Sequence, residues 1–432
     1  MNKIYKVVWN NTLQCFTVVS EIAKSHTKNQ AKAVVGSVLF TTLLGMSASA
    51  NAGNYDASQS VYDDLVFDSY AYLQNGAELT VNKNLTIEKG ASVSGRQGQS
   101  IDVKGDASIL NDIKIDESYT SAPASSLAIS KLNVDGSLKL KADDFFDNSH
   151  SSNNWISRPL ARLDVETATV GKDLTLEKAI VYSQKIAGSS TSRGSMEVSG
   201  DVSLNSSTLS VGTSTFTTKG DLTATDGSFL LVMSGDAELK IGNNLKVSDS
   251  SIQVSDTGKL NINGAATVDN TRFVVGKNSE FNVADDFTFT GEANFNAYSN
   301  AKVNVDGNFV LNTDNGNYNN SGVSDGAVLT VGNDLIVNGD SYLCNHDNAT
   351  VNIKGNLELN NRKDDIINSV AYDNVKVNVD GDLKVKGGSS FGTNHNVDVV
   401  VKGNLDLAND GEFYTYNTFY SNTNITVGKD FN

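Results

Sequence analysis

A short pattern of hydrophobic and polar residues recurs along most of the chain. Its clearest copy is Val377-Asn-Val-Asp-Gly-Asp-Leu-Lys-Val385, in which two apolar-polar-apolar segments flank three turn residues. Alternation with a period of two predicts strands with one buried face, and Gly, Asn and Asp between the segments predict a tight corner. Each copy therefore predicts two short strands joined by a corner.

The pattern repeats with a spacing that is typical of a solenoid. Most successive copies are 20 to 26 residues apart, and longer gaps occur only before residue 198. Stacked coils of this kind pair parallel strands between neighbours and bury a continuous apolar column. We therefore predict an all-β fold, a right-handed parallel β-helix, after a helical signal peptide that is cleaved. The second apolar residue of each of the fifteen copies lies at 81, 103, 134, 170, 198, 218, 241, 262, 283, 305, 331, 353, 379, 401 and 427.

The predicted coils have distinct inner and outer positions. In six copies an Asn occupies the outward position of the first segment, where stacked side chains either hydrogen-bond along the stack or form an ordinary polar surface. The sequence leaves both possibilities open. The six residues are Asn133, Asn261, Asn282, Asn304, Asn352 and Asn378. The residues predicted to point inward include Val305, Val331, Ile353, Val379, Leu335, Leu357 and Leu383.

The first 52 residues have a different character. Residues 1–32 carry five lysines and one acidic residue, residues 33–46 are apolar, and residues 47–52 are mostly small. This order predicts a signal peptide, and the apolar stretch is too short for a transmembrane helix. Two overlapping cleavage sites end at Ala50 and Ala52.

This leader is longer than an ordinary signal peptide. Its segments Met1-Asn-Lys-Ile-Tyr-Lys-Val-Val-Trp-Asn10 and Val18-Val-Ser-Glu-Ile-Ala-Lys24 resemble the extended signal peptide region of type V secreted proteins, the autotransporters and related surface proteins of Gram-negative bacteria. The resemblance implies export by the Sec and outer-membrane machinery, to the cell surface, the outer membrane or the medium. It also implies a passenger domain, which in this family is mostly a right-handed β-helix.

Composition limits the partners and the chemistry. The formal net charge of −16 disfavours binding to nucleic acid, because phosphates are repelled. Cys344 is the one cysteine beyond the leader, so we expect no internal disulfide and a small buried thiol. Gly339-Asp-Ser-Tyr-Leu343 superficially resembles a lipase motif but lies inside a repeat. We predict no catalytic residue, no cofactor and no metal site.

The repeats also define the expected domains. We predict an N-terminal cap at residues 53–74 and a β-helix passenger at residues 75–432. No membrane-barrel pattern follows, and the chain stops within a repeat. We therefore expect a fragment or truncated passenger, whose last coil associates end to end or frays. Aromatic residues at 412–420 are expected to line the core of that coil.

Insertions interrupt the repeats near residues 112–126, 142–161 and 312–326. Insertion loops of solenoids often bind partners, so Phe145, Phe146 and Trp155 in the second loop are the candidate binding residues.

The favoured function is a non-enzymatic autotransporter adhesin passenger that mediates adherence or self-association. Its partners would be host or matrix glycans or proteins, or the same protein on a neighbouring cell. One alternative is a β-helix polysaccharide lyase or glycosidase, which needs acidic residues clustered with Arg or Lys in a cleft. No such cluster is evident in the sequence. The other alternative is a truncated passenger fragment without function.

Overall fold

The computed structural model has two compact units, Met1–Leu43 and Leu44–Asn432. The structure describes residues 5–10, 15–20, 48–50, 53–55, 60–95, 98–113, 124–143, 145–146, 158–159, 161–185, 193–313, 321–361, 369–407 and 417–432.

In the first unit, the described residues are strands. β1 (Tyr5–Asn10) pairs antiparallel with β2 (Cys15–Ser20), and Trp9 lies opposite Phe16. The helical leader that we expected is therefore not found over these residues, which are rich in the β-branched and aromatic side chains that favour strands. The apolar stretch at 33–46 lies outside the described residues. In the part of the chain that the structure describes, no helix is long and apolar enough to cross a membrane.

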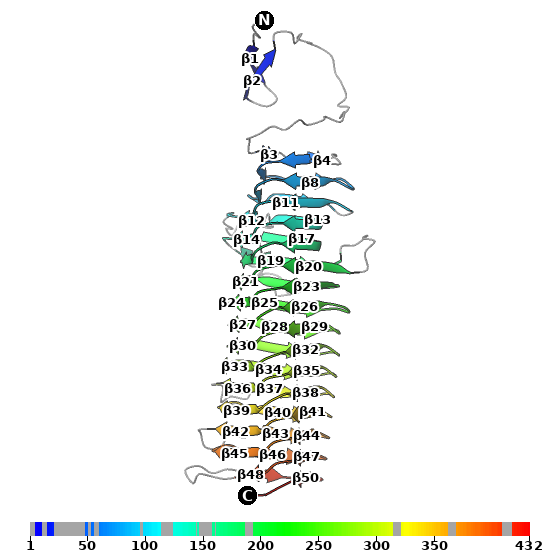
Figure 1. Ribbon diagram of the computed structural model, residues 1–432, viewed down its shortest axis with the longest axis vertical. Helices are drawn as coiled ribbons and strands as arrows, with labels where there is room; N and C mark the ends of the chain where they lie inside the picture. The colour runs from blue at the N-terminus through cyan, green and yellow to red at the C-terminus, as the bar shows by residue number, and fades with distance from the viewer. Residues whose placement is uncertain are drawn as a thin grey trace. The chain divides into compact units, whose positions relative to one another are not determined.

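The second unit is a parallel β-solenoid, as predicted from the repeats. One coil comprises β30 (Ala266–Asp269), β31 (Arg272–Val275) and β32 (Glu280–Val283), and the three strands of the next coil pair with them in parallel (Figure 1). The first strand of each coil belongs to one sheet, here called sheet 1. The second and third strands belong to a second sheet, in which they form two columns, here called column a and column b. No measurement bears on the hand of the coil, which stays a prediction.

Sixteen described strands form sheet 1, in the order of the chain. They are β3 Ala48–Ala50, β6 Leu65–Phe67, β9 Leu85–Ile87, β12 Ala107–Asn111, β14 Leu138–Ala142, β18 Leu174–Glu177, β21 Val202–Asn205, β24 Leu222–Thr225, β27 Leu245–Ser248, β30, β33 Phe287–Gly291, β36 Phe309–Thr313, β39 Leu335–Gly339, β42 Leu357–Asn361, β45 Leu383–Gly387 and β48 Leu405–Asp406.

Column a holds the second strand of each coil. It consists of β4 Gly53–Tyr55, β7 Ala71–Leu73, β10 Ser92–Ser94, β19 Ala179–Ser183, β22 Thr208–Val211, β25 Phe229–Met233, β28 Ser251–Ser255, β31, β34 Asn294–Ala297, β37 Ser321–Val323, β40 Leu343–His346, β43 Ser369–Tyr372, β46 Phe391–Asn394 and β49 Thr418–Phe419.

Column b holds the third strand of each coil. It consists of β5 Ser60–Tyr62, β8 Glu78–Val81, β11 Ser100–Val103, β20 Gly194–Val198, β23 Ser214–Thr218, β26 Glu238–Ile241, β29 Lys259–Ile262, β32, β35 Lys302–Val305, β38 Val328–Val331, β41 Thr350–Ile353, β44 Lys376–Val379, β47 Asp398–Val401 and β50 Asn424–Val427. Two longer strands, β13 (Ser125–Val134) and β17 (Ala161–Val170), run through both columns and join them.

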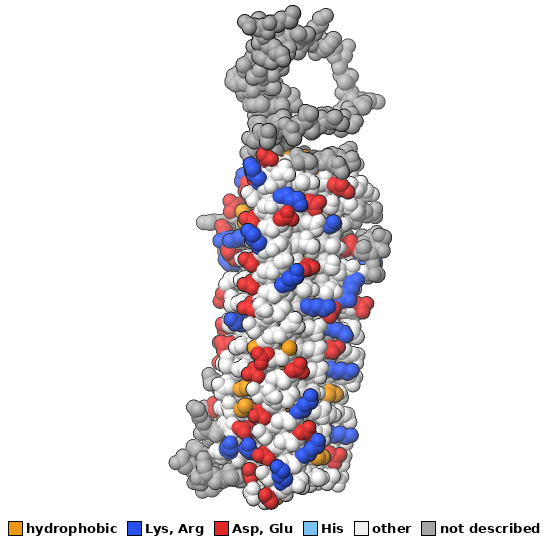
Figure 2. All heavy atoms as spheres, viewed as in Figure 1, with side chains coloured by type: hydrophobic (Ala, Val, Ile, Leu, Met, Phe, Trp, Pro, Cys, Tyr) orange, Lys and Arg blue, Asp and Glu red, His pale blue; other side chains and the backbone are white. Residues whose placement is uncertain are grey.

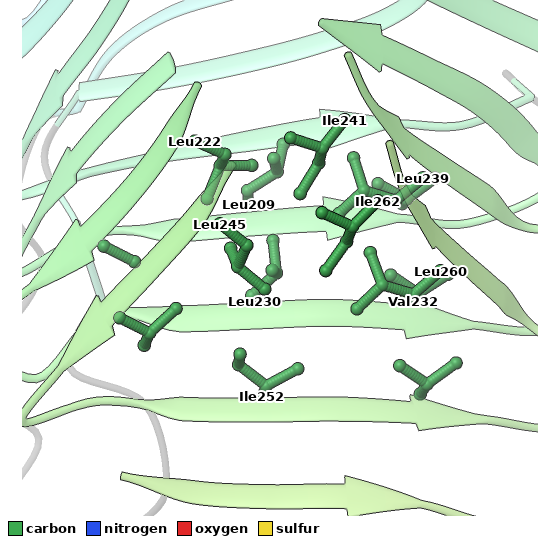
Figure 3. Close-up of a cluster of buried hydrophobic side chains, with 14 of the residues drawn as sticks. Leu209, Leu222, Leu230, Val232, Leu239, Ile241, Leu245, Ile252, Leu260 and Ile262 are labelled. Atoms are coloured by element: carbon green, nitrogen blue, oxygen red, sulfur yellow. The ribbon is translucent and has the colours of Figure 1, made fainter. Parts of the chain in front are cut away.

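The interior is a continuous apolar column. Figure 3 shows Leu222 of sheet 1, Leu230 of column a and Leu239 of column b pointing into one space. The seven residues that we predicted to point inward are each at most 2% exposed, so that prediction is confirmed. At 412–420 the expectation was wrong for Phe419 and Tyr420, which are 38% and 59% exposed because no described strand packs beyond β49.

The predicted cap at residues 53–74 contains strands of the same sheets. β6 pairs in register with β9, and β7 with β10, so these residues already form coils. The domain boundaries themselves stay predictions.

Candidate functional site

The corner between column b and sheet 1 is held by a ladder of Asp and Asn side chains, here called the corner ladder. Asp334 Oδ1 accepts the backbone N–H of Asn356 at 2.6 Å, and Asn356 Oδ1 accepts that of Asp382 at 2.9 Å. Each side chain thus satisfies a backbone donor of the next coil. The same contact is made by Asp64, Asn84, Asp106, Asp173, Asp201, Asp221, Asn244, Asp286, Asn308, Asp382 and Asn404.

A second ladder, here called the face ladder, runs along the outer side of column b. Asn282 Nδ2 donates to Asn261 Oδ1 at 2.7 Å, and Asn304 Nδ2 donates to Asn282 Oδ1 at 2.8 Å. Farther along, Asn378 Nδ2 donates to Asn352 Oδ1 at 2.9 Å. Of the two possibilities that the sequence left open, hydrogen bonding along the stack is therefore confirmed at these positions.

A groove, here called the side groove, lies between the face ladder and the adjoining corner. Its volume is about 630 Å³, and it extends over the five coils from β23 to β35. Two of the residues that line it, Gly242 and Ala284, are small residues at the corner. The lining residues are Thr217, Thr218, Lys219, Lys240, Gly242, Asn261, Ile262, Asn263, Asn282, Val283, Ala284, Asn304 and Asp306. A separate, smaller groove of about 330 Å³ lies on the same column around Asn352 and Asn378.

Both lysines that line the side groove are paired with glutamates. Lys219 lies 2.7 Å from Glu197, and Lys240 lies 3.3 Å from Glu238. A hydrogen bond from Lys259 lowers the pKa of Glu280, which also accepts a hydrogen bond from Asn282 at 3.2 Å. Figure 2 shows acidic and basic side chains interspersed along the face in view, with few hydrophobic ones. The side groove therefore offers neutral amides and hydroxyls to a ligand more than a net charge.

The predicted binding loop is only partly described. β15 (Phe145–Phe146) pairs antiparallel with β16 (Arg158–Pro159), whereas Trp155 lies outside the described residues. This site stays a prediction.

The predicted cleavage sites fall at the beginning of the solenoid. Ala50 is the last residue of β3, which pairs with β6, and Ala52 lies outside the described residues. Which of the two sites is cleaved also stays a prediction.

The polar residues that could act in catalysis make hydrogen bonds or are buried within the solenoid. Ser341, in the lipase-like segment, is buried and its Oγ accepts the backbone N–H of Thr313 at 2.8 Å. His346 Nδ1 lies 2.7 Å from Asp347 Oδ2, and the His346 ring stacks on that of Tyr372, with ring centroids 5.1 Å apart. Cys344 is buried, as predicted, and burial raises the pKa of its thiol. Among the described residues, no three His, Cys, Asp or Glu side chains are placed to hold a metal ion.

The leader indicates the route by which this protein is exported. Residues 1–50 match the family described as the Extended Signal Peptide of Type V secretion system. The leader is a type V secretion signal. The resemblance of its two segments is thereby confirmed, and the protein is exported to the cell surface or outer membrane of a Gram-negative bacterium.

Comparison with curated proteins also finds adhesins. The chain is 40% identical over 73 residues to "Autotransporter adhesin NhhA" of Neisseria meningitidis serogroup B (strain ATCC BAA-335 / MC58), which is 17% of this chain and 12% of that protein. It is 41% identical over 58 residues to "Trimeric autotransporter adhesin AtaA" of Acinetobacter sp. (strain Tol 5), which is 11% of this chain and 2% of that protein. The matches thus span about an eighth of the first relative and far less of the second. No solved structure matches the chain. The type V secreted protein described here is therefore adhesin-like.

Sequence reasoning missed the corner ladder and the side groove. The recurring Asp or Asn at the third turn residue was a readable signal for the ladder. The side groove could not be predicted from the sequence, because it depends on which corner positions carry small residues in neighbouring coils.

Proposed function

We propose that this protein is the non-enzymatic rod of a type V secreted adhesin, and that its side groove binds extended glycans of a host or matrix. The observation that carries the proposal is the run of hydrogen-bonded amides, Asn261, Asn282 and Asn304, along an open polar groove. Export to the surface, and partial similarity to two adhesins, support the same function.

The spacing of the ladder suits a polymer that lies along the rod. Successive coils are about 4.8 Å apart, so a ligand parallel to the axis meets a similar set of groups at each coil. An Asn amide has two N–H donors. Asn282 uses both, one to Asn261 and one to Glu280. Asn261 donates one to Glu238 and Asn304 donates one to Asn282, so these two residues each retain a donor for a ligand hydroxyl. Because both lining lysines are paired with glutamates, we expect binding to depend weakly on salt.

The test uses the full chain and a panel of immobilised neutral and acidic host glycans. Ala284 is exposed and lines the side groove, so Ala284→Trp fills the groove without entering the core. Asn82→Trp is the matched control, because Asn82 is exposed at the same corner position of a distant coil. We expect glycan binding by the parent and by Asn82→Trp, and its loss in Ala284→Trp.

Two outcomes would contradict the glycan proposal. One is the absence of binding to any glycan on the panel. The other is equal binding by all three proteins, which would place the site elsewhere on the rod. If cells displaying the protein aggregate while glycan binding is absent, the partner is a second copy of the chain.

A further inference from the structure

Coil lengths alternate in the last third of the solenoid. The equivalent inward residues of column b, from Val283 to Val427, are separated by 22, 26, 22, 26, 22 and 26 residues. In the preceding coils, from Val198 to Val283, the spacings are 20, 23, 21 and 21 residues, without alternation. Two coils, or 48 residues, are therefore the period of this segment.

The sequence has the same period. Residues 283–330, 331–378 and 379–426 align without gaps, and eight positions are identical in all three segments. Five of the eight are corner residues, represented in the first segment by Asp286, Gly291, Asn300, Gly307 and Asn308. Corner residues determine where the chain turns, so their recurrence points to repetition of a structural unit.

The two coils of each unit differ in how sheet 1 connects to column a. In the first coil the strand ends at a glycine with positive φ, which allows a tight corner: Gly291, Gly339 and Gly387, with φ of 59°, 61° and 60°. After Gly339, column a resumes at Leu343. In the second coil the connection is longer, because β36 ends at Thr313 and β37 begins at Ser321. The corner ladder alternates in step, with Asp in the first coil and Asn in the second.

A long-connection coil contacts the tight coil that follows it, as seen at Thr313. Thr313, where the long connection begins, pairs in register with Gly339 of the tight corner. Its buried backbone N–H donates to Ser341 Oγ at 2.8 Å, which satisfies a donor that would otherwise be buried alone. Asn308 Oδ1 in turn accepts the backbone N–H of Asp334 at 3.2 Å. The tight coil thus supplies hydrogen-bond partners to the long-connection coil that precedes it.

We infer that residues 283–426 are three tandem copies of a two-coil module, and that this module is the unit by which the rod changes its length. Adding or removing a module changes the reach of the rod by two coils and the number of long connections by one. The inference is independent of glycan binding. The middle copy, residues 331–378, contains no residue that lines the side groove.

The test compares two deletions in the full chain. Deletion of 331–378 removes one module and places Asp382 next to Asn308, so the alternation of the corner ladder is kept. Deletion of 331–352 removes a single coil and joins Thr330 to Ile353, which preserves the strand register. It also removes Ser341 from beside Thr313 and places Asn308 next to Asn356. An insertion that duplicates 331–378 provides a third variant.

We expect both module variants to unfold within about 2–4 °C of the parent, since each keeps the same kinds of interface between neighbouring coils as the parent. The single-coil deletion should unfold at a lower temperature than either, and should lose amide-exchange protection at Thr313. Equal midpoints for the single-coil and module deletions would overturn the inference. So would a loss of stability in both module variants that exceeds the loss in the single-coil deletion. Glycan binding by the side groove is a separate readout and should be unchanged by the module deletion.

Discussion

Asn282 Nδ2 donates a hydrogen bond of 2.7 Å to Oδ1 of Asn261, the residue directly above it in the preceding coil. Asn304 makes the equivalent bond to Asn282 from the following coil. Asn282 is therefore both donor and acceptor in the middle of the face ladder, and both contacts link coils that are already paired through their backbones. The ladder fixes amides that also border the side groove.

Replacing Asn282 by Asp tests the contribution of this ladder. An aspartate has nearly the same shape but no N–H, so its carboxylate would face Asn261 Oδ1 without a proton between the oxygens. We expect a loss of about 1–3 kcal/mol in the free energy of unfolding, the usual cost of removing one hydrogen-bond partner. Denaturant titration at neutral pH measures it. Asn263→Asp is the control, because Asn263 is exposed and lies two residues after Asn261, outside the face ladder. Equal stability of the two variants would show that the ladder contributes nothing.

A cluster of phenylalanines in the core makes a second prediction. The ring centroid of Phe287 lies 4.6 Å from that of Phe289 and 5.1 Å from that of Phe309, and Phe287 is fully buried. Phe287→Ala removes these contacts and leaves a cavity, so we expect a loss of about 3–5 kcal/mol in unfolding free energy. Phe229→Ala should cost much less, since Phe229 is 43% exposed. Similar losses for both variants, measured by denaturant unfolding, would argue against a tightly packed core at Phe287.

Much of this fold could be predicted, because the alternation of apolar and polar residues along a strand indicates which side chains are buried. Val305 and Leu335 were assigned to the interior from alternation alone, and both are fully or almost fully buried. The contacts that join coils were harder to predict. Asp334 and Asn356 lie 22 residues apart in the chain, and no local pattern states that one accepts the backbone N–H of the other. The leader could be recognised from its sequence, but its strands at residues 5–10 were not expected.

The corner glycines allow close approach between stacked coils. A Cβ on Gly355 would lie 2.3 Å from Asp334 Oδ1 and 2.7 Å from the backbone carbon of Asn333. Because the backbone cannot move away without breaking the ladder, Gly355→Ala should lower the unfolding midpoint by several degrees. Gly235→Ala is a matched control, since the atom nearest to its Cβ would be Thr257 Oγ1 at 3.7 Å. Thermal unfolding followed by circular dichroism distinguishes them, and a midpoint for Gly355→Ala equal to that of the control would contradict the close approach.

The corner ladder also predicts a dependence of stability on pH. Asp382 Oδ1 accepts the backbone N–H of Asn404 at 2.8 Å, and this bond, with the nearby Lys384 and Lys429 charges, lowers the pKa of Asp382 below its ordinary value of 3.8. A carboxyl group with a lowered folded-state pKa binds protons more weakly when folded than when unfolded. Its ionisation therefore stabilises the fold above about pH 3.8, and this contribution is lost as the pH falls through the folded-state pKa.

Asp382→Asn isolates this effect, because an Asn side chain can still accept the N–H of Asn404 but does not ionise. We expect the parent to be more stable than the variant at pH 7, with a difference that stays constant down to about pH 4 and then shrinks. Unfolding free energies between pH 7 and pH 2.5 provide the measurement. Asp398→Asn serves as the control, since Asp398 is exposed on column b and is not part of the corner ladder. Parallel stability curves for the parent and Asp382→Asn across the whole range would mean that the ionised carboxylate of Asp382 does not stabilise the corner.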